Sequence, residues 1–352
     1  MNYRKSFLNT VAILLFYLGV PKLLNGIANW LQRNENEDGK LVFPFVKRRW
    51  CGNVQILVYH RVNDDRDPFF SGTPSDVFRK QMDYLVSNFN ILSLEDAVEG
   101  LARKDVPDNA IVVTFDDGYR DNYLNAFPIL NNLSIPATIF LATDAIGSGR
   151  MLWHDRVFSA FRQTRVPFLD GFGARSKQYP LSTIHDKVVA LEEFLNFIRA
   201  RTDRERASWI DCLIETLGVS DSREVSGLML SWDEVRMMHE GGISFGSHSV
   251  THPILSKLPT DRIRDEIQES KLVIEQELHT PVRTFAYPNG REEDYNEITK
   301  SLLREAGYTC AVTTQFGNNE SGCDLFELRR ATPWDRDIYA FGLRLNYYKL
   351  RY

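Results

Sequence analysis

Two carboxylates and two imidazoles stand at spacings that suit hydrolysis at a metal ion. Asp116 and Asp117 are adjacent and followed by a glycine, and much later in the chain His248 and His252 lie within one five-residue stretch. One carboxylate and two imidazoles are enough protein ligands for a catalytic zinc-type ion, which keeps a position open for water and substrate. The other carboxylate would then stand where a hydrolase needs a general base. These residues predict a metal-dependent hydrolase.

Apolar runs that are typical of buried strands precede both motifs. Residues 110–113 lead into the aspartate pair, and residues 243–246 lead toward the first histidine. A third run, 54–60, ends at His60, and its apolar members would fill both faces, as in a strand covered by helices. A last strand is expected near 326–332. Strands that alternate with helices predict a parallel α/β architecture.

The C-terminal ends of the expected strands favour a barrel. They carry His60, the aspartate pair, His248, Tyr287 and Pro288. In a β/α barrel this is the face on which the active site is built. Seven or eight strand–helix units fit the length of 352 residues. A doubly wound open sheet is the competing fold, but no GxGxxG pattern follows the first strand.

Residues from about 147 to 228 interrupt the alternation. This segment holds glycine-containing loops and amphipathic helices, and we interpret it as a mainly helical insertion between barrel units, a lid or substrate wall. The predicted organisation is a hydrophobic anchor or signal-like segment at 1–33, a linker at 34–53, and a barrel at 54–352 that contains the insertion.

The overall charge argues against one class of function. The chain has 42 Lys and Arg against 47 Asp and Glu, a net charge of −5, so no basic face dominates and no nucleic-acid partner is expected. Its 43% hydrophobic and 25% charged residues are ordinary for a globular protein with a large core. The four cysteines show no close metal-ligand spacing. Their number and spacing do not indicate whether the protein lies in an oxidising or a reducing compartment.

The N-terminal segment has three interpretations. The uncharged stretch between Lys5 and Lys22 falls just short of the roughly 17–25 residues expected of a spanning helix. A signal peptide is a second interpretation, which Lys22 weakens, and a helix packed on the domain is a third. Residues 6–30 are therefore expected to associate the protein with a membrane. The expected location is at a membrane or in the cell envelope, and the cytoplasmic face of a membrane is an alternative.

Three motifs, taken together and in this order, point to one family. They are TFDDGY at 114–119, SHSVTHP at 247–253 and FAYPNG at 285–290. With them, residues 54–335 resemble the polysaccharide deacetylases of carbohydrate esterase family four, which include chitin, peptidoglycan and poly-N-acetylglucosamine deacetylases. The resemblance implies a distorted seven-stranded, TIM-like β/α barrel. It also implies divalent-metal-dependent removal of N- or O-acetyl groups from sugars.

The resemblance gives each motif residue a role. Asp116 matches the general base of the family, and Asp117, His248 and His252 match its metal ligands. Zn²⁺ is the first choice of ion, with Co, Ni or Fe as alternatives. A turn at Gly118 is needed to bring both carboxylates to the metal, because neighbours on a plain strand face opposite ways.

Two features of many family members are missing here. An arginine usually stands two residues before the proline of the third motif, where it braces the catalytic aspartate, but this position is Ala286 and Arg283 is out of register. A late Leu-x-His usually supplies the general acid, whereas residues 328–330 read Leu-Arg-Arg. In the branch that acts on poly-N-acetylglucosamine, a histidine after the first strand fills this role. His60 is therefore the candidate acid.

Substrate contacts are expected from three further residues. Tyr287 and Pro288 should shape the pocket floor, with the Tyr287 backbone N–H as an oxyanion donor, and Trp153 should offer an aromatic platform to a sugar. Ordinary packing is the alternative for Trp153, and His154 is a weaker alternative to His60 as acid.

The expected function is a metal-dependent hydrolase that removes acetyl groups from the N-acetylated sugars of a glycan, which is its expected partner. A deformylase or amidase acting on a lipid-linked sugar or small amide is the alternative. A catalytically silent carbohydrate-binding protein is a third hypothesis, which the intact base and ligand residues disfavour.

Overall fold

The computed structural model describes residues 52–351 except 173–176, 222 and 224. The segment expected at 1–33 and nearly all of the linker lie outside the described residues, so membrane association and location stay predictions. Within the described residues, no helix combines the length and apolar character needed to span a bilayer.

A curled sheet positions the site. In the described part of the chain it has eight strands, and parallel neighbours follow one another in the order β1, β3, β4, β7, β8 and β9. Short β2 pairs with β3 in parallel, and β10 pairs with β1 in antiparallel fashion. The bounds are β1 Asn53–Tyr59, β2 Asn90–Ile91, β3 Ala110–Phe115, β4 Ala137–Leu141, β7 Ser244–Ser247, β8 Thr284–Ala286, β9 Cys310–Val312 and β10 Asn319–Glu320.

The segment after β10 spans the gap between the two ends of the parallel run. Leu328 forms one bridge with Val312 of β9, and Ala331 forms one with Leu57 of β1. The strand expected at 326–332 is therefore present only as these isolated bridges. Because the segment contacts both β9 and β1, it completes the ring that a barrel requires.

Helices cover the outside of the sheet. They are α3 Ser75–Asn88, α4 Leu94–Arg103, α5 Phe127–Asn132 with the π-helical turn Asn122–Ala126 before it, α9 Trp232–Glu240, α10 Thr260–Leu278, α11 Glu297–Glu305 and α12 Ile338–Arg351. Short 3-10 turns lie at Leu255–Lys257 and Glu292–Asp294. Parallel strands alternating with covering helices confirm the predicted α/β barrel class.

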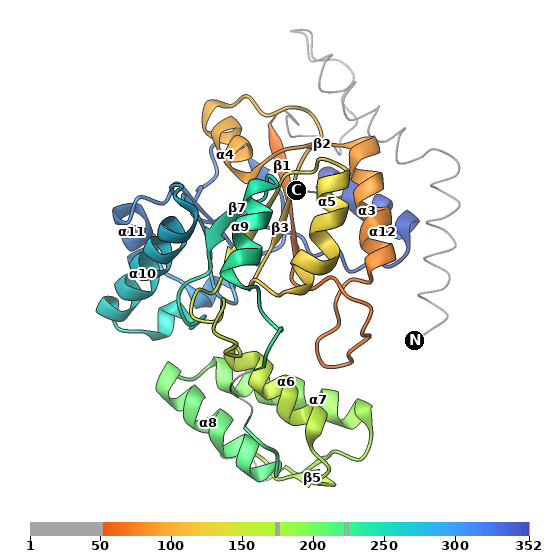
Figure 1. Cartoon of the computed structure of the whole chain (residues 1–352), viewed down its shortest axis with the longest axis vertical. Helices are drawn as coiled ribbons and strands as arrows, with labels where there is room; N and C mark the ends of the chain where they lie inside the picture. The colour runs from red at the N-terminus through yellow and green to blue at the C-terminus, as the bar shows by residue number, and fades with distance from the viewer. Residues whose placement is uncertain (1–51, 173–176, 222, 224, 352) are drawn as a thin grey trace.

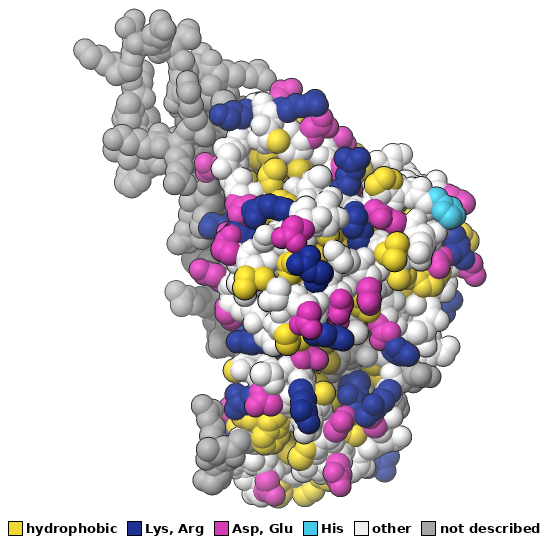
Figure 2. Space-filling view, turned by 90° about the vertical axis from the view of Figure 1, so that its left-hand side faces the viewer, with side chains coloured by type: hydrophobic (Ala, Val, Ile, Leu, Met, Phe, Trp, Pro, Cys, Tyr) yellow, Lys and Arg dark blue, Asp and Glu magenta, His cyan; other side chains and the backbone are white. Residues whose placement is uncertain are grey.

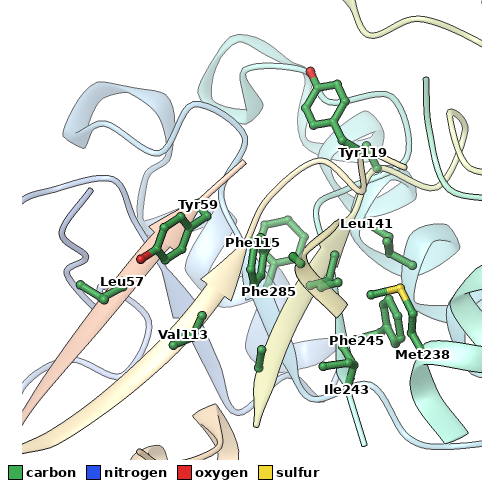
Figure 3. Packing of buried hydrophobic residues seen from close by; sticks show 14 of the residues in the cluster. Leu57, Tyr59, Val113, Phe115, Tyr119, Leu141, Met238, Ile243, Phe245 and Phe285 are labelled. Carbon is green, nitrogen blue, oxygen red and sulfur yellow. The ribbon is translucent and has the colours of Figure 1, made fainter. Parts of the chain in front are cut away.

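The strands are apolar on both faces because each face packs against something. Leu57 and Val113 belong to the large core between sheet and helices (Figure 3), whereas Ile56 and Val112 belong to a second cluster that α4 closes. Successive strand residues point to opposite faces, so a continuous apolar run is what a doubly covered strand requires.

The predicted helical insertion is a lobe with its own apolar core. It holds α6 Trp153–Gln163, β5 Phe168–Leu169, β6 Tyr179–Pro180, α7 Ile184–Arg199 and α8 Asp203–Thr216. Figure 1 shows these helices together beyond one end of the barrel. Thr183 and Thr202 form capping boxes that begin α7 and α8. Arg162 of this lobe forms an ion pair with Asp67 of the loop between β1 and α3, which ties the lobe to the barrel.

Charges of both signs are mixed on one face of the molecule. Figure 2 shows lysine and arginine side chains interspersed with aspartate and glutamate over the visible face.

Candidate active site

The turn after β3 brings the aspartate pair to one place. The Asp116 N–H donates to the Tyr59 carbonyl at 3.0 Å, which extends the β1–β3 pairing by one residue. Asp117 and Gly118 then take φ of 73° and 83°. Left-handed backbone reverses the chain, and a Cβ at Gly118 would lie 2.8 Å from Ile146 Cδ1. The predicted glycine turn is present.

A second strained turn carries the histidines. After β7, Ser249 and His252 take φ of 65° and 58°, which non-glycine residues rarely adopt. The Glu266 carboxylate on α10 fixes this loop by accepting the backbone N–H groups of Val250 and Thr251 at 2.8 and 2.9 Å. The Thr251 hydroxyl adds a third bond at 2.7 Å. Buried Glu266 therefore positions both histidines from outside the site.

Three ligand atoms converge in the interior. Asp117 Oδ1 lies 3.5 Å from His248 Nε2 and 3.3 Å from His252 Nε2, and one ligand atom from each residue falls within 4.8 Å of the others. His248 Nδ1 is bonded to the Ala286 carbonyl at 2.7 Å, which turns Nε2 toward Asp117.

The chemistry of these atoms fits a cation. Asp117 Oδ1 is buried without a hydrogen-bond partner, which is costly for a carboxylate oxygen unless a metal ion or donor occupies the site. Burial alone would raise the pKa of Asp117, but electrostatic attraction to His252 and the neighbouring imidazoles outweighs burial and holds this pKa far below its ordinary range. Burial lowers the pKa of His248 to about 4, so its imidazole is neutral, as a metal ligand must be.

Asp116 is locked by a buried arginine. Arg330 Nη1 and Nη2 donate to Asp116 Oδ1 and Oδ2, both at 2.7 Å, and Arg330 Nε donates to the Thr313 carbonyl at 2.7 Å. Both side chains are at most 2% exposed. Burial would raise the pKa of Asp116, but the opposing Arg330 charge lowers it below its ordinary value. The carboxylate is thus ionised and fixed in one orientation.

Arg330 was not among the residues expected at the site. The usual bracing arginine is absent at Ala286, and residues 328–330 stood out in the sequence only by their lack of a histidine. A signal was present, because Arg330 shares a face with Leu328 in an extended segment, and Leu328 belongs to the cluster of buried strand residues. A charged side chain on that face requires a buried partner.

The two candidate acids have different surroundings. His60 Nε2 lies 4.0 Å from Asp116 Oδ2, and its side chain is 35% exposed. His154 Nε2 lies 3.9 Å from Asp117 Oδ2 and bonds the Tyr119 hydroxyl at 3.0 Å. Burial lowers the pKa of His154 to about 3. His154 is therefore neutral and has no imidazolium proton to donate, which favours His60.

These residues surround a cavity of about 260 Å³. His60, the aspartate pair and both metal-site histidines line it. The insertion lobe closes it with Trp153, Leu195 and Arg199. Trp153 also donates its indole N–H to the His252 carbonyl at 3.0 Å, so it supports the histidine loop as well as facing the cavity.

The predicted oxyanion donor is wrong. The Tyr287 N–H donates to the Val312 carbonyl at 3.1 Å as part of the β8–β9 pairing, and its hydroxyl donates to the Phe326 carbonyl at 2.9 Å. Pro288 is buried and precedes the turn that places Asn289 in the cavity wall. Asn289 has φ of 63°, and its Nδ2 is buried without a partner. Asn289 was not among the residues expected from the sequence, and it lines the cavity beside a Tyr287 N–H that is already engaged.

Comparison with known proteins decides the family. A sequence model described as polysaccharide deacetylase matches residues 103–311. The chain belongs to this family. The recognition made from the three motifs is confirmed.

Two curated proteins illustrate the range of relatives. The YxkH protein of Bacillus subtilis, named for the polysaccharide deacetylases, is 22% identical over 288 residues, which are 81% of this chain and 73% of that protein. The poly-β-1,6-N-acetyl-D-glucosamine N-deacetylase of Staphylococcus epidermidis is 35% identical over 161 residues, which are 42% of this chain and 52% of that protein.

Solved structures share the fold. A Streptococcus pyogenes deacetylase, PplD in complex with acetate, aligns with a TM-score of 0.54 at 20% identity, over 80% of this chain and 92% of that one. IcaB from Ammonifex degensii aligns with a TM-score of 0.53 at 19% identity, over 83% of this chain and 97% of that one. At this identity they show the barrel fold of the family.

Proposed function

We propose that the protein is a metal-dependent hydrolase that removes acetyl groups from N-acetylated sugars of a glycan. The observation that carries the proposal is the convergence of Asp117 Oδ1 and two imidazole nitrogens in a buried cavity, beside an ionised Asp116. Family membership supports deacetylation. The Staphylococcus epidermidis relative, whose name specifies poly-β-1,6-N-acetyl-D-glucosamine, supports an N-acetylglucosamine polymer as substrate.

Asp117, His248 and His252 would hold the ion. One carboxylate oxygen and two imidazole nitrogens form a donor set that suits Zn²⁺ and leaves a coordination position open, while Co, Ni or Fe accept the same donors. When bound, such an ion supplies Lewis-acid polarisation of an acyl oxygen and makes water more acidic.

The remaining residues move protons and hold the substrate. Asp116 accepts a proton from the attacking water, and the two bonds from Arg330 keep its carboxylate ionised and aimed at the cavity. His60, on the same cavity wall and in protonated form, donates a proton to the departing sugar amine as the C–N bond breaks. The products are acetate and a free amine.

Asn289 replaces the backbone donor expected at Tyr287. Its unpartnered Nδ2 can donate to the acetyl oxygen as negative charge develops there. One such donor typically contributes about 2.7–4 kcal/mol to stabilising the transition state.

Acetate release by the full-length chain tests the proposal. The Zn²⁺-loaded protein should release acetate from N-acetylglucosamine oligomers. Asp116→Asn should abolish release while retaining the metal, whereas the matched variant Asp117→Asn should lose both, with metal content measured by mass spectrometry. A metal-loaded protein that releases no acetate from any glycan of such a panel would overturn the proposed reaction.

A further inference from the structure

Two arginines line the catalytic cavity, one from the insertion lobe and one from the barrel. Arg199 is the last residue of α7, and Arg291 follows β8 and precedes the 3-10 turn Glu292–Asp294. Neither has a role in the proposed reaction. Because a guanidinium is charged at neutral pH, two positive charges border a cavity of about 260 Å³.

The guanidinium of Arg199 is poorly satisfied by the protein. Among the described residues it forms no ion pair; its Nη1 donates to Asn196 Oδ1 on the same helix at 3.4 Å, and its Nε is buried without a partner. Burial lowers the pKa of Arg199, and the positive charge of Arg291 lowers it further. The carboxylates of Asp294 and Glu293 oppose this only in part. A partly desolvated cation near a like charge costs free energy unless an anion joins it.

The carboxylates around the cavity do not balance these charges. Arg291 Nη1 lies 3.9 Å from Glu293 Oε1, but the two side chains are 48% and 66% exposed, and such a pair contributes little in water. Within the described part of the chain, Asp116 and Asp117 are the only carboxylates that line the cavity. Arg330 already balances Asp116, and Asp117 belongs to the proposed metal site. The two arginine charges are therefore available to a ligand.

Arginine suits one ligand chemistry. Its guanidinium carries only N–H donors, and their planar fork matches the paired oxygens of a carboxylate or a phosphate. A cleft lined by one sign of charge also raises the local concentration of ligands of the opposite sign. A neutral sugar would fill the cavity and leave both arginines unbalanced, whereas an anionic substituent on the sugar would balance them and could accept from Arg199 Nε.

We propose that Arg199 and Arg291 recognise an oxyanion substituent, a carboxylate or a phosphate, on the N-acetylated sugar that enters the catalytic cavity. The inference rests on the proposed function and narrows its preferred substrate to an anionic glycan. Both arginines bind this substituent and not the acetyl group, so they set specificity and do not take part in the chemical step.

Substrates that differ only in charge test the proposal. For the full-length Zn²⁺-loaded protein, kcat/KM for acetate release is measured on β-1,4- and β-1,6-linked N-acetylglucosamine oligomers that carry a carboxymethyl ether or a phosphate monoester on a ring hydroxyl. The neutral methyl esters of the same compounds are measured beside them. The anionic-to-neutral ratio should be about 10- to 100-fold, the range of charge-assisted hydrogen bonds, for the carboxylate or the phosphate series. The series that shows this preference identifies the substituent.

Charge-removing variants assign the preference to the arginines. Arg199→Gln should bring the ratio close to one, and Arg291→Gln should lower it less because Arg291 is more exposed. The change should appear in KM with kcat retained, because the contact is the same before and during the reaction. Arg199→Lys, which keeps the charge without the fork, should retain part of the preference.

Arg204→Gln is the matched control. It removes the same charge from α8 of the same lobe, but Arg204 is exposed and does not line the cavity, so the wild-type ratio should persist. A wild-type ratio near one in both series overturns the proposal. A ratio that Arg199→Gln lowers no more than Arg204→Gln does also overturns it.

Direct binding separates this inference from the proposed reaction. If the wild-type protein releases no acetate, titration calorimetry of the same oligomers into the Zn²⁺-loaded wild-type and Arg199→Gln proteins measures the preference without turnover. Tighter binding of an anionic oligomer than of its ester, lost in Arg199→Gln, supports the inference even though the reaction has failed. Equal binding, or no binding of any anionic oligomer, overturns it. Acetate release without a charge preference overturns the inference and leaves the reaction in place.

Discussion

Replacing Arg330 by methionine tests the catalytic geometry most sharply. The substitution keeps an unbranched side chain but removes both hydrogen bonds to Asp116, a pair in which neither partner is more than 2% exposed. Breaking a buried ion pair by removing one partner costs about 3–5 kcal/mol, because the remaining charge is left without compensation. Desolvation then dominates, and the pKa of Asp116 rises instead of lying below its ordinary value.

This reversal has a definite sign in both activity and stability. The lowered pKa of Asp116 stabilises the wild-type protein above the unfolded value of about 3.9, and that contribution is lost as the pH falls through the folded pKa. In Arg330→Met the pKa of Asp116 is raised, so an ionised Asp116 lowers the free energy of unfolding. The difference in this free energy from wild type should therefore be small at acidic pH, where Asp116 is protonated, and should grow toward neutral pH. The acidic limb of the kcat/KM profile should move to higher pH.

Urea unfolding at several pH values and the pH profile of acetate release are the assays. Arg330→Lys, which keeps the charge but cannot form two parallel bonds, should be intermediate and guards against a variant that does not fold. Metal content should stay at the wild-type level, because Arg330 bonds Asp116 and not the ligands. An unshifted acidic limb in a folded, metal-loaded Arg330→Met protein would refute the assigned role of the Asp116–Arg330 pair.

Three further predictions concern the metal-site loop, the oxyanion donor and the ion. Glu266→Gln should weaken metal binding about 10–100-fold in a metal titration by releasing the histidine loop, and unchanged affinity would contradict the positioning role of Glu266. Asn289→Ala should lower kcat about 10²–10³-fold at unchanged metal content, and an effect on KM alone would remove Asn289 from the transition state. A chelator should abolish acetate release, with recovery on adding Zn²⁺.

The sequence determined the parts of the site that depend on neighbours along the chain. Asp116 and Asp117 share one turn, and His248 and His252 share another, so residue type and spacing were enough to predict that each pair would act together. Both turns follow apolar runs that form strands, and parallel strands present their C-terminal ends on one face. That rule also placed His60 beside the aspartates.

The tertiary structure decided every partner that arrives from a distant segment. Arg330 reaches Asp116 because residues 328–331 span the gap between β9 and β1, and no local pattern specifies that contact. The Tyr287 N–H donates to the Val312 carbonyl on β9, so strand pairing engages the group that the sequence suggested as an oxyanion donor. Local spacing fixes which groups share a turn, but strand pairing and barrel closure fix which groups meet across the fold. The role of a buried charge such as Asp116 therefore depends on the partner that the fold brings to it from a distant segment.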